Sequence, residues 1–362
     1  MGFAAIAQAP PGKAARPLRL VVLDDDAVFR TVLSRLLTSL GLEVVAACST
    51  IESARKRLAG GDVDAVTVDV VLRNESGLDF LKWCRATHPS VITVLVTAGT
   101  EKGARTGVDA VFLGASALLT KPDAKSLAGF EDELRRVFAD GKGREPSAQQ
   151  RRPIVPPSGP RLKPEPRRDL LAIGSSTGGP PALLKVLKGL PAWFTAPIVI
   201  TQHMPSLHLG YLAELLTQQG GRPVEVAMDR APLQKGRAYL AGHGKHLTIE
   251  RVGGQLVSRH FDGPAEHHCK PAVDPMFRSI AQVCPGTCLA LVLTGMGADG
   301  AKGAVALRQT GNPVLIQDQD SSVVWGMPGA VMNAGAADAV ASIDRLSQTV
   351  LEWMAWPQGG TR

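Results

Sequence analysis

Residues 170–187 place the tightest constraint on the fold, because a buried strand must turn there at once into a helix. The apolar run from Leu170 to Ile173 suits a strand of a parallel sheet. Two prolines and the apolar spacing of residues 182–187 predict a helix that begins just after the glycines. The intervening G-x-S-x-G stretch, 174–178, allows a sharp turn that lifts the Ser176 hydroxyl out of the sheet.

Two kinds of chemistry fit this turn. Backbone N–H groups at the start of a helix can stabilise the oxyanion formed when a serine attacks a carbonyl. The same helix start can instead bind a phosphate or another anion without any nucleophile. The stretch by itself leaves both interpretations open.

Two later strands favour the nucleophile. The apolar run 198–200 leads to His203, and the run 289–294 leads through glycines to Asp299. Because the carboxyl ends of strands in a doubly wound sheet gather along one edge, Ser176, His203 and Asp299 can meet there. A neutral imidazole takes the serine proton and a carboxylate fixes its tautomer. The candidate oxyanion hole consists of backbone N–H groups near Thr177 and Met296.

The second half of the chain resembles the chemotaxis response-regulator protein-glutamate methylesterases, the CheB family, in residues 173–179, 201–205 and 293–300. Carried over position by position, the resemblance makes Ser176 the nucleophile, His203 the general base and Asp299 the orienting carboxylate. Ser175 replaces the alanine expected before the nucleophile. The order Ser, His, Asp differs from the Ser, Asp, His order of α/β-hydrolases, which argues against an ordinary lipase or esterase.

In the first half, apolar runs alternate with helical spacing and end on polar residues. This alternation predicts a small parallel α/β domain. Its sheet edge would collect the residues that follow the strands: Asp24, Asp25, Asp69, Thr97 and Lys121. Clustered carboxylates repel one another unless a cation joins them, and hard oxygen ligands suit Mg²⁺.

This set resembles the receiver domain of two-component response regulators, which implies a flavodoxin-like, doubly wound sheet. By the resemblance, Asp69 is the phospho-acceptor, and Asp24 and Asp25 help it hold Mg²⁺. Thr97 and Lys121 contact the phosphoryl oxygens. A carboxylate attacks phosphorus only where metal and ammonium charges offset the developing negative charge.

Several positions depart from the receiver pattern, although Gly77 matches the family's loop glycine. Arg73 stands where a proline is usual, and Val71 stands where a polar residue is common. Leu118 occupies a position where an aromatic switch residue is frequent. These departures leave the expected fold intact and bear on phosphorylation kinetics and the route of switching.

Residues 141–168 form a basic, proline-rich stretch between the two halves. Its eight basic and two acidic residues leave only about +1 of the formal net charge of +7 for the rest of the chain. Seven prolines argue against a helix or a central strand. With no aromatic residue among the charges, a solvated linker is favoured over a nucleic-acid arm. The predicted organisation is a receiver domain at 17–140, a linker at 141–168 and a methylesterase domain at 169–356.

Compartment and metal content are predicted from cysteine and histidine usage. The five cysteines form no CxxC pair and the first sixteen residues lack a basic signal-peptide start, so reduced thiols in the cytoplasm are expected. No apolar run approaches the ~20 residues of a membrane span, so no membrane insertion is expected. An antiparallel hairpin is predicted around residues 253–254. The nearby histidines could suggest a metal site, but exposed loop positions are favoured: His243, His246, His267 and His268.

The resemblance implies an enzyme that hydrolyses glutamate γ-methyl esters on chemoreceptors and deamidates selected receptor glutamines, with no cofactor for the hydrolysis. Its phosphodonor would be the chemotaxis histidine kinase. A receiver-controlled transcription factor is the first alternative, but the second half is too strand-rich and carries no basic recognition helix, so no DNA partner is expected. A non-catalytic signalling partner is the second, and it would not need Ser176, His203 and Asp299 together.

Overall fold

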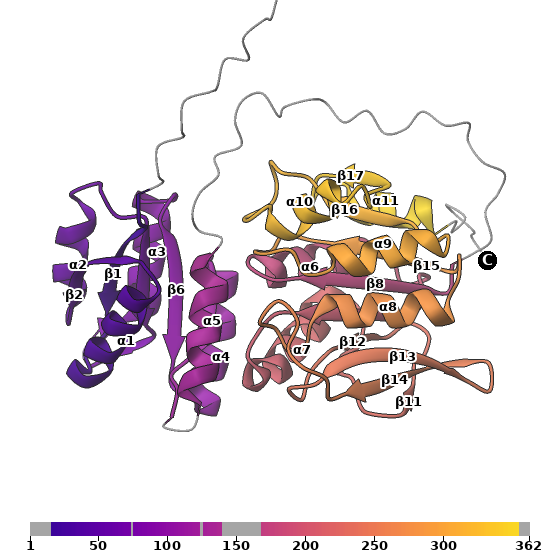
Figure 1. The fold of residues 1–362 in the computed structure, drawn as a ribbon, viewed down its shortest axis with the longest axis horizontal. Coiled ribbons are helices and arrows are strands. Elements are labelled where there is room, and N and C mark those ends of the chain that lie inside the picture. The colour runs from indigo at the N-terminus through magenta and orange to yellow at the C-terminus, as the bar shows by residue number, and fades with distance from the viewer. Residues whose placement is uncertain (1–15, 74, 124–125, 140–167, 355–362) are drawn as a thin grey trace, which may run out of the picture.

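The computed structural model describes residues 16–73, 75–123, 126–139 and 168–354. These residues form two parallel sheets, each covered by helices on both faces (Figure 1). The predicted α/β class, with one doubly wound sheet in each half, is confirmed. The predicted linker, 141–168, lies outside the described residues except for Arg168. None of the described helices is long and apolar enough to cross a membrane.

The first half contains a five-stranded parallel sheet in the order β2-β1-β3-β6-β7. Its strands are β2 (Glu43–Cys48), β1 (Arg19–Leu23), β3 (Ala65–Asp69), β6 (Ile92–Thr97) and β7 (Ala117–Thr120), and a short ribbon pairs β4 (Val71–Leu72) with β5 (Glu75–Ser76). Its helices are α1 (Ala27–Ser39), α2 (Ile51–Leu58), α3 (Gly77–Thr87), α4 (Glu101–Phe112) and α5 (Leu127–Ala139).

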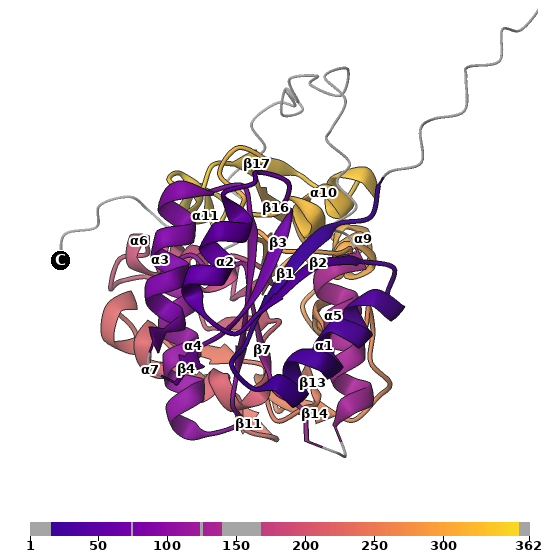
Figure 2. The ribbon, with the colours of Figure 1, turned by 90° about the vertical axis from the view of Figure 1, so that its left-hand side faces the viewer.

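Alternation along β1 decides which helix covers which face of this sheet. Leu20 and Val22 point to one face, where α1 and α5 pack on them. Val21 and Leu23 point to the other, which α2, α3 and α4 cover. Figure 2 shows the two helix layers on either side of the sheet.

The second half contains a seven-stranded parallel sheet in the order β10-β12-β9-β8-β15-β16-β17. Its strands are β10 (Val224–Val226), β12 (Ala238–Leu240), β9 (Ile198–Gln202), β8 (Leu170–Ser175), β15 (Cys288–Val292), β16 (Val314–Gln317) and β17 (Ala339–Ala341). One face is covered by α6 (Gly179–Gly189), α7 (Ser206–Gly220) and α11 (Leu346–Trp353). The other face is covered by α8 (Val273–Val283), α9 (Ala301–Gln309) and α10 (Gly326–Asn333).

The hairpin predicted around residues 253–254 is confirmed. It joins β13 (His246–Val252) to β14 (Gln255–Phe261) in antiparallel register, and β11 (Ala231–Pro232) pairs with β14 on the far side. Gly253 and Gly254, which form the turn, both have positive φ angles of 56° and 83°. The stretch 238–240, which precedes the hairpin, instead pairs with β9 and β10 in the main sheet.

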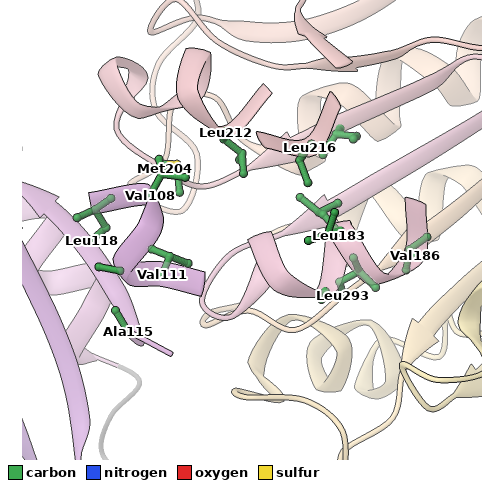
Figure 3. Packing of buried hydrophobic residues seen from close by; sticks show 14 of the residues in the cluster. Val108, Val111, Ala115, Leu118, Leu183, Val186, Met204, Leu212, Leu216 and Leu293 are labelled. Carbon is green, nitrogen blue, oxygen red and sulfur yellow. The ribbon is translucent and has the colours of Figure 1, made fainter. Parts of the chain in front are cut away.

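The two halves meet through an apolar interface. Helix α4 of the first half packs against α6 and α7 of the second. One continuous hydrophobic cluster spans both halves, and Figure 3 shows members from each side: Val108, Val111, Ala115 and Leu118 from the first, and Met204 and Leu212 from the second. The carboxyl edge of the seven-stranded sheet therefore lies close to the first half.

Candidate active site

Ser176 lies where β8 turns into α6, as the sequence pattern predicted. Gly178 has a φ of 75°, and α6 begins immediately after it, with prolines in its first turn. The Ser176 amide donates a hydrogen bond to Thr294 O at 3.1 Å, which ties the turn to the end of β15. Gly295 is required at this contact, because a Cβ there would lie 2.9 Å from Ser176 Cβ and 2.4 Å from Met327 Sδ.

Gln202 fastens the serine turn to the histidine. Its side-chain amide donates to Ser176 O and to His203 O, both at 2.9 Å. Its oxygen accepts a hydrogen bond from Ser175 Oγ at 2.7 Å. Gln202 was not among the residues predicted from the sequence, although its position directly before His203 at a strand end was the available signal. The side chains of Ser175, Gln202 and His203 are all buried.

His203 and Asp299 form a buried pair. The distance from His203 Nε2 to Asp299 Oδ2 is 2.8 Å. Asp299 also accepts hydrogen bonds from the amides of Val273 (2.6 Å), Asp274 (2.9 Å) and Gly300 (2.8 Å). Because Val273 and Asp274 begin α8, the positive end of that helix faces the carboxylate. Besides His203, the carboxylate is therefore held by backbone amides.

Charge is concentrated on this pair. Burial favours the neutral carboxyl, but the hydrogen bonds from His203 and the α8 amides outweigh it and lower the pKa of Asp299. Burial likewise favours the neutral imidazole, but the neighbouring Cys269 and Asp299 side chains outweigh it and raise the pKa of His203 to about 9. Both shifts favour a charged imidazole beside a charged carboxylate.

The second ring nitrogen of His203 is the one available for proton transfer. Nδ1 is buried and has no hydrogen-bond partner among the described residues. His203 and Ser176 line the same cavity, although no hydrogen bond between their side chains forms in this state. Thr177 and Met296, the candidate oxyanion residues, also line it. The structure thus gathers the predicted nucleophile, base and oxyanion groups around one space.

The first half of the chain covers part of that space and narrows it. Its wall includes Val111, Leu118 and Val137, and its volume is about 30 Å³. This is enough for a water molecule but not for a substrate side chain. A cleft of about 1010 Å³ reaches His203, Cys269 and Asp299 from another side, but Ser176 does not line it.

The histidines outside the proposed triad are only partly as expected. His246 was predicted to be exposed, and this is wrong: it is fully buried, accepting from the Ala272 amide at 3.1 Å and contacting Pro264 O at 2.8 Å. His267 lies 3.1 Å from Asp274 Oδ2 and near Asp299. Those carboxylates already accept backbone amides from Val273, Gly303 and other residues, which fits an anchored loop better than a metal site.

The predicted acidic cluster also forms. Ligand atoms of Asp24, Asp25 and Asp69 all lie within 4.8 Å of one another, at the ends of β1 and β3. Lys121 Nζ lies 2.8 Å from Asp24 Oδ2 and 2.7 Å from Asp69 Oδ2. Three carboxylates at this spacing fit a hard divalent cation such as Mg²⁺, which would supply charge for phosphoryl transfer when bound. Asp69 has its side chain almost fully buried beside the lysine.

The electrostatics of this cluster follow from burial and pairing. Burial raises the pKa of Asp24, partly opposed by Lys121. Burial also works against the charged ammonium of Lys121, but hydrogen bonds to Asp24 and Asp69 outweigh it and raise its pKa. Position 77 requires glycine for steric reasons, since a Cβ there would lie 2.1 Å from Asp69 O. Thr97 at the end of β6 is fully buried, and its hydroxyl lies 3.4 Å from Leu119 O.

Arg73 makes a further contact with this cluster, because its Nε lies 3.3 Å from Asp25 Oδ2. The guanidinium is largely exposed, so the pair is weak, but it occupies a carboxylate that a cation would need. We expect Arg73→Ala to strengthen Mg²⁺ binding a few-fold, measured by titration calorimetry. Lys82→Ala, which breaks an exposed pair with Asp79, is the matched control and should leave the affinity unchanged. Equal affinities in Arg73→Ala and wild type would contradict this role.

Comparisons with known proteins agree on both halves. Residues 171–350 match the CheB methylesterase family model, and residues 20–128 match the response regulator receiver domain model. A protein-glutamate methylesterase/protein-glutamine glutaminase of Caulobacter vibrioides is 36% identical, with 91% of this chain and 96% of the relative aligned. A protein-glutamate methylesterase/protein-glutamine glutaminase of Trichodesmium erythraeum is 35% identical, with 92% of this chain and 98% of the relative aligned. The crystal structure of the Thermotoga maritima CheB methylesterase catalytic domain is 34% identical, covers 51% of this chain and 98% of that one, and gives a TM-score of 0.50.

Proposed function

Because this chain belongs to the CheB methylesterase family, we propose that it hydrolyses γ-methyl esters of glutamate on chemoreceptors and deamidates selected receptor glutamines. The substrate is inferred from the names of the relatives described above. Each predicted chemical role falls on a residue at the edge of the seven-stranded sheet. We place the reaction in the cytoplasm, where five buried cysteines remain as free thiols.

The proposed reaction is acyl transfer through Ser176. His203 Nδ1 takes the hydroxyl proton as the oxygen attacks the ester carbonyl, and the tetrahedral oxyanion is stabilised by the Thr177 and Met296 amides. The proton then passes to the leaving oxygen, which releases methanol and leaves a glutamyl ester on Ser176. His203 next activates water, which releases glutamate and restores the serine. Deamidation follows the same steps with ammonia as the leaving group.

One observation supports this proposal most: His203 Nε2 is held by a carboxylate that three backbone amides fix, and His203 lines the same cavity as Ser176. Trapping tests the proposal directly. A serine-directed fluorophosphonate should label wild type at Ser176, detected by mass spectrometry of the peptide, once the first half has been displaced or removed.

We further propose that the first half is a receiver domain, 17–140, that controls this site through phosphorylation of Asp69 by the chemotaxis histidine kinase. The linker, 141–168, would connect it to the catalytic domain, 169–356. Lys121 and Thr97 would contact the phosphoryl oxygens, with Mg²⁺ held by Asp24, Asp25 and Asp69. The small, narrowed cavity at Ser176 supports a resting state in which the receiver blocks the substrate.

Replacing the orienting carboxylate should be milder than removing the nucleophile or the base. We expect Asp299→Asn to lower kcat on the order of 10² to 10⁴-fold, because the carboxylate aligns His203 rather than reacting. The side-chain amide is close to isosteric but keeps only one acceptor oxygen, so either Val273, which binds Oδ2, or Asp274 and Gly300, which bind Oδ1, would lose an acceptor. The measurement is steady-state ester hydrolysis. A loss as large as that of Ser176→Ala would contradict an orienting role.

The raised pKa of His203 predicts a pH profile. His203 must be unprotonated to take the serine proton, so kcat/KM should rise with pH through the His203 pKa and level off above it. We expect a midpoint well above 6.5 in the full chain, and a lower midpoint in Asp299→Asn because the stabilising negative charge is lost. Profiles from pH 5 to pH 10 measure both. A wild-type midpoint at or below 6.5 would contradict the buried ion pair.

A further inference from the structure

A histidine of the catalytic half lies against the threonine that is expected to sense phosphorylation. His208 Nε2, on α7, is 3.4 Å from Thr97 Oγ1 at the end of β6. Both side chains are fully buried, although they belong to different halves of the chain. The contact lies next to the α4–α7 packing, because Gly107 of α4 also approaches the His208 ring.

The other hydrogen-bond partner of the Thr97 hydroxyl indicates which group donates in this contact. Thr97 Oγ1 also lies 3.4 Å from Leu119 O, a carbonyl that can only accept. The hydroxyl therefore donates to Leu119, and its lone pairs face His208. With the hydroxyl in that orientation, His208 Nε2 donates to Thr97. Burial lowers the pKa of His208 to about 4, against a smaller opposing effect of the Pro205 backbone, which favours the neutral ring.

The His208 ring fits here because its neighbours Gly107 and Leu118 are small or aliphatic. A Cβ at Gly107 of α4 would lie 3.2 Å from His208 Cδ2 and 2.8 Å from Leu118 Cδ1. Leu118 occupies the position where the receiver pattern often has an aromatic residue. With glycine at 107 and leucine at 118, the ring beside Thr97 is supplied by the other half of the chain.

We propose that His208 is the residue through which the catalytic half senses the phosphorylation state of Asp69, by losing its hydrogen bond to Thr97 when that hydroxyl turns to the phosphoryl group. The inference rests on the proposed function and names the contact that couples the two domains. A docked phosphorylated protein would hold the His208 N–H in an apolar interface without an acceptor. That penalty falls on the docked state alone, because water satisfies the same group once the halves separate.

Two substitutions separate the hydrogen bond from the packing. His208→Leu keeps an apolar side chain but removes the N–H, so docking no longer depends on where the Thr97 hydroxyl points. His208→Gln keeps an N–H donor at a similar reach. Arg105→Ala is the matched control: it breaks the exposed Arg105–Glu214 pair (3.6 Å) and the contact of Arg105 with Tyr211, which lie on the same two helices.

The experiment follows hydrogen exchange of the α7 amides in the full chain, with and without an acyl phosphate and Mg²⁺. Phosphorylation of wild type should speed α7 exchange, since the halves separate. In His208→Leu the phosphorylation-dependent increase should fall about ten-fold, and in His208→Gln it should persist. Arg105→Ala should raise exchange in both states and keep the increase. A His208→Leu protein that responds like wild type would overturn the inference.

Esterase assays on the same samples distinguish this inference from the proposed function. An intact exchange response in wild type without any methanol release would remove the esterase function and leave the His208 contact standing. Methanol release by wild type, together with a full exchange response in His208→Leu, would support the esterase function and overturn the role of His208. If mass spectrometry shows phosphorylated Asp69 but wild-type α7 exchange does not change, the inference fails together with receiver control.

Discussion

Ser176→Ala should reduce hydrolysis of glutamyl methyl esters on the order of 10⁴ to 10⁶-fold, as nucleophile removal does in other Ser-His-Asp enzymes. The hydrogen bonds given for Ser176 among the described residues involve its backbone N–H and C=O, which the substitution keeps. We therefore expect the free energy of unfolding to change by less than about 1 kcal/mol. Steady-state kinetics and thermal unfolding of the same preparation measure the two effects.

Ser175→Ala is the matched control for this prediction, because Ser175 is the neighbouring buried serine. Its hydroxyl donates to Gln202, so its loss should cost about 1 kcal/mol of stability and loosen the turn. We expect a decrease in rate of about ten-fold or less. His203→Ala should resemble Ser176→Ala. A Ser176→Ala enzyme that keeps the wild-type rate would exclude the acyl-enzyme mechanism.

Release of the receiver should give the second large effect. We expect deletion of residues 1–140 to raise basal esterase activity about 5- to 150-fold, the usual range of coupling between two sites. The cause is the cavity at Ser176, which Val111, Leu118 and Val137 narrow to about 30 Å³. The related Thermotoga maritima catalytic domain was crystallised as a separate domain, which supports folding of the truncated chain. Ester hydrolysis by both proteins is the measurement.

A phosphodonor should reproduce this activation in the full chain. An acyl phosphate with Mg²⁺ would replace the single negative charge of the Asp69 carboxylate with about −1.5 to −2 charges on the phosphoryl group, beside Lys121. We expect wild type to be activated and Asp69→Asn to remain at its basal rate. A truncated protein no more active than the full chain, together with a full chain that ignores the phosphodonor, would show that the receiver does not gate the site.

Much of the fold could be predicted because each strand is an apolar run with a polar residue at its carboxyl end. The runs before Ser176, His203 and Asp299 became β8, β9 and β15, which are neighbours in the sheet. A parallel sheet fixes the edge on which such residues meet, so their convergence follows from strand order. The catalytic roles of Ser176, His203 and Asp299 remain predictions, which the kinetic measurements test.

The supporting contacts could not be predicted, because they join segments that local patterns do not relate. Asp299 is held by amides of α8, about 25 residues earlier in the chain. Gln202 bridges two strand ends, and His208 reaches Thr97 across 111 positions. His246 was assigned to an exposed loop for the same reason, since its burial depends on packing against the loop that precedes α8.

Methanol release from methylated chemoreceptor membranes tests the central proposal most directly. The purified full chain, incubated with an acyl phosphate and Mg²⁺, should release methanol in proportion to the methyl ester present, and Ser176→Ala should release none above the background without enzyme. The membranes should lose methyl ester from glutamate side chains to the same extent. Methanol release by Ser176→Ala at the wild-type rate, or no release by activated wild type, would contradict a serine methylesterase at this site.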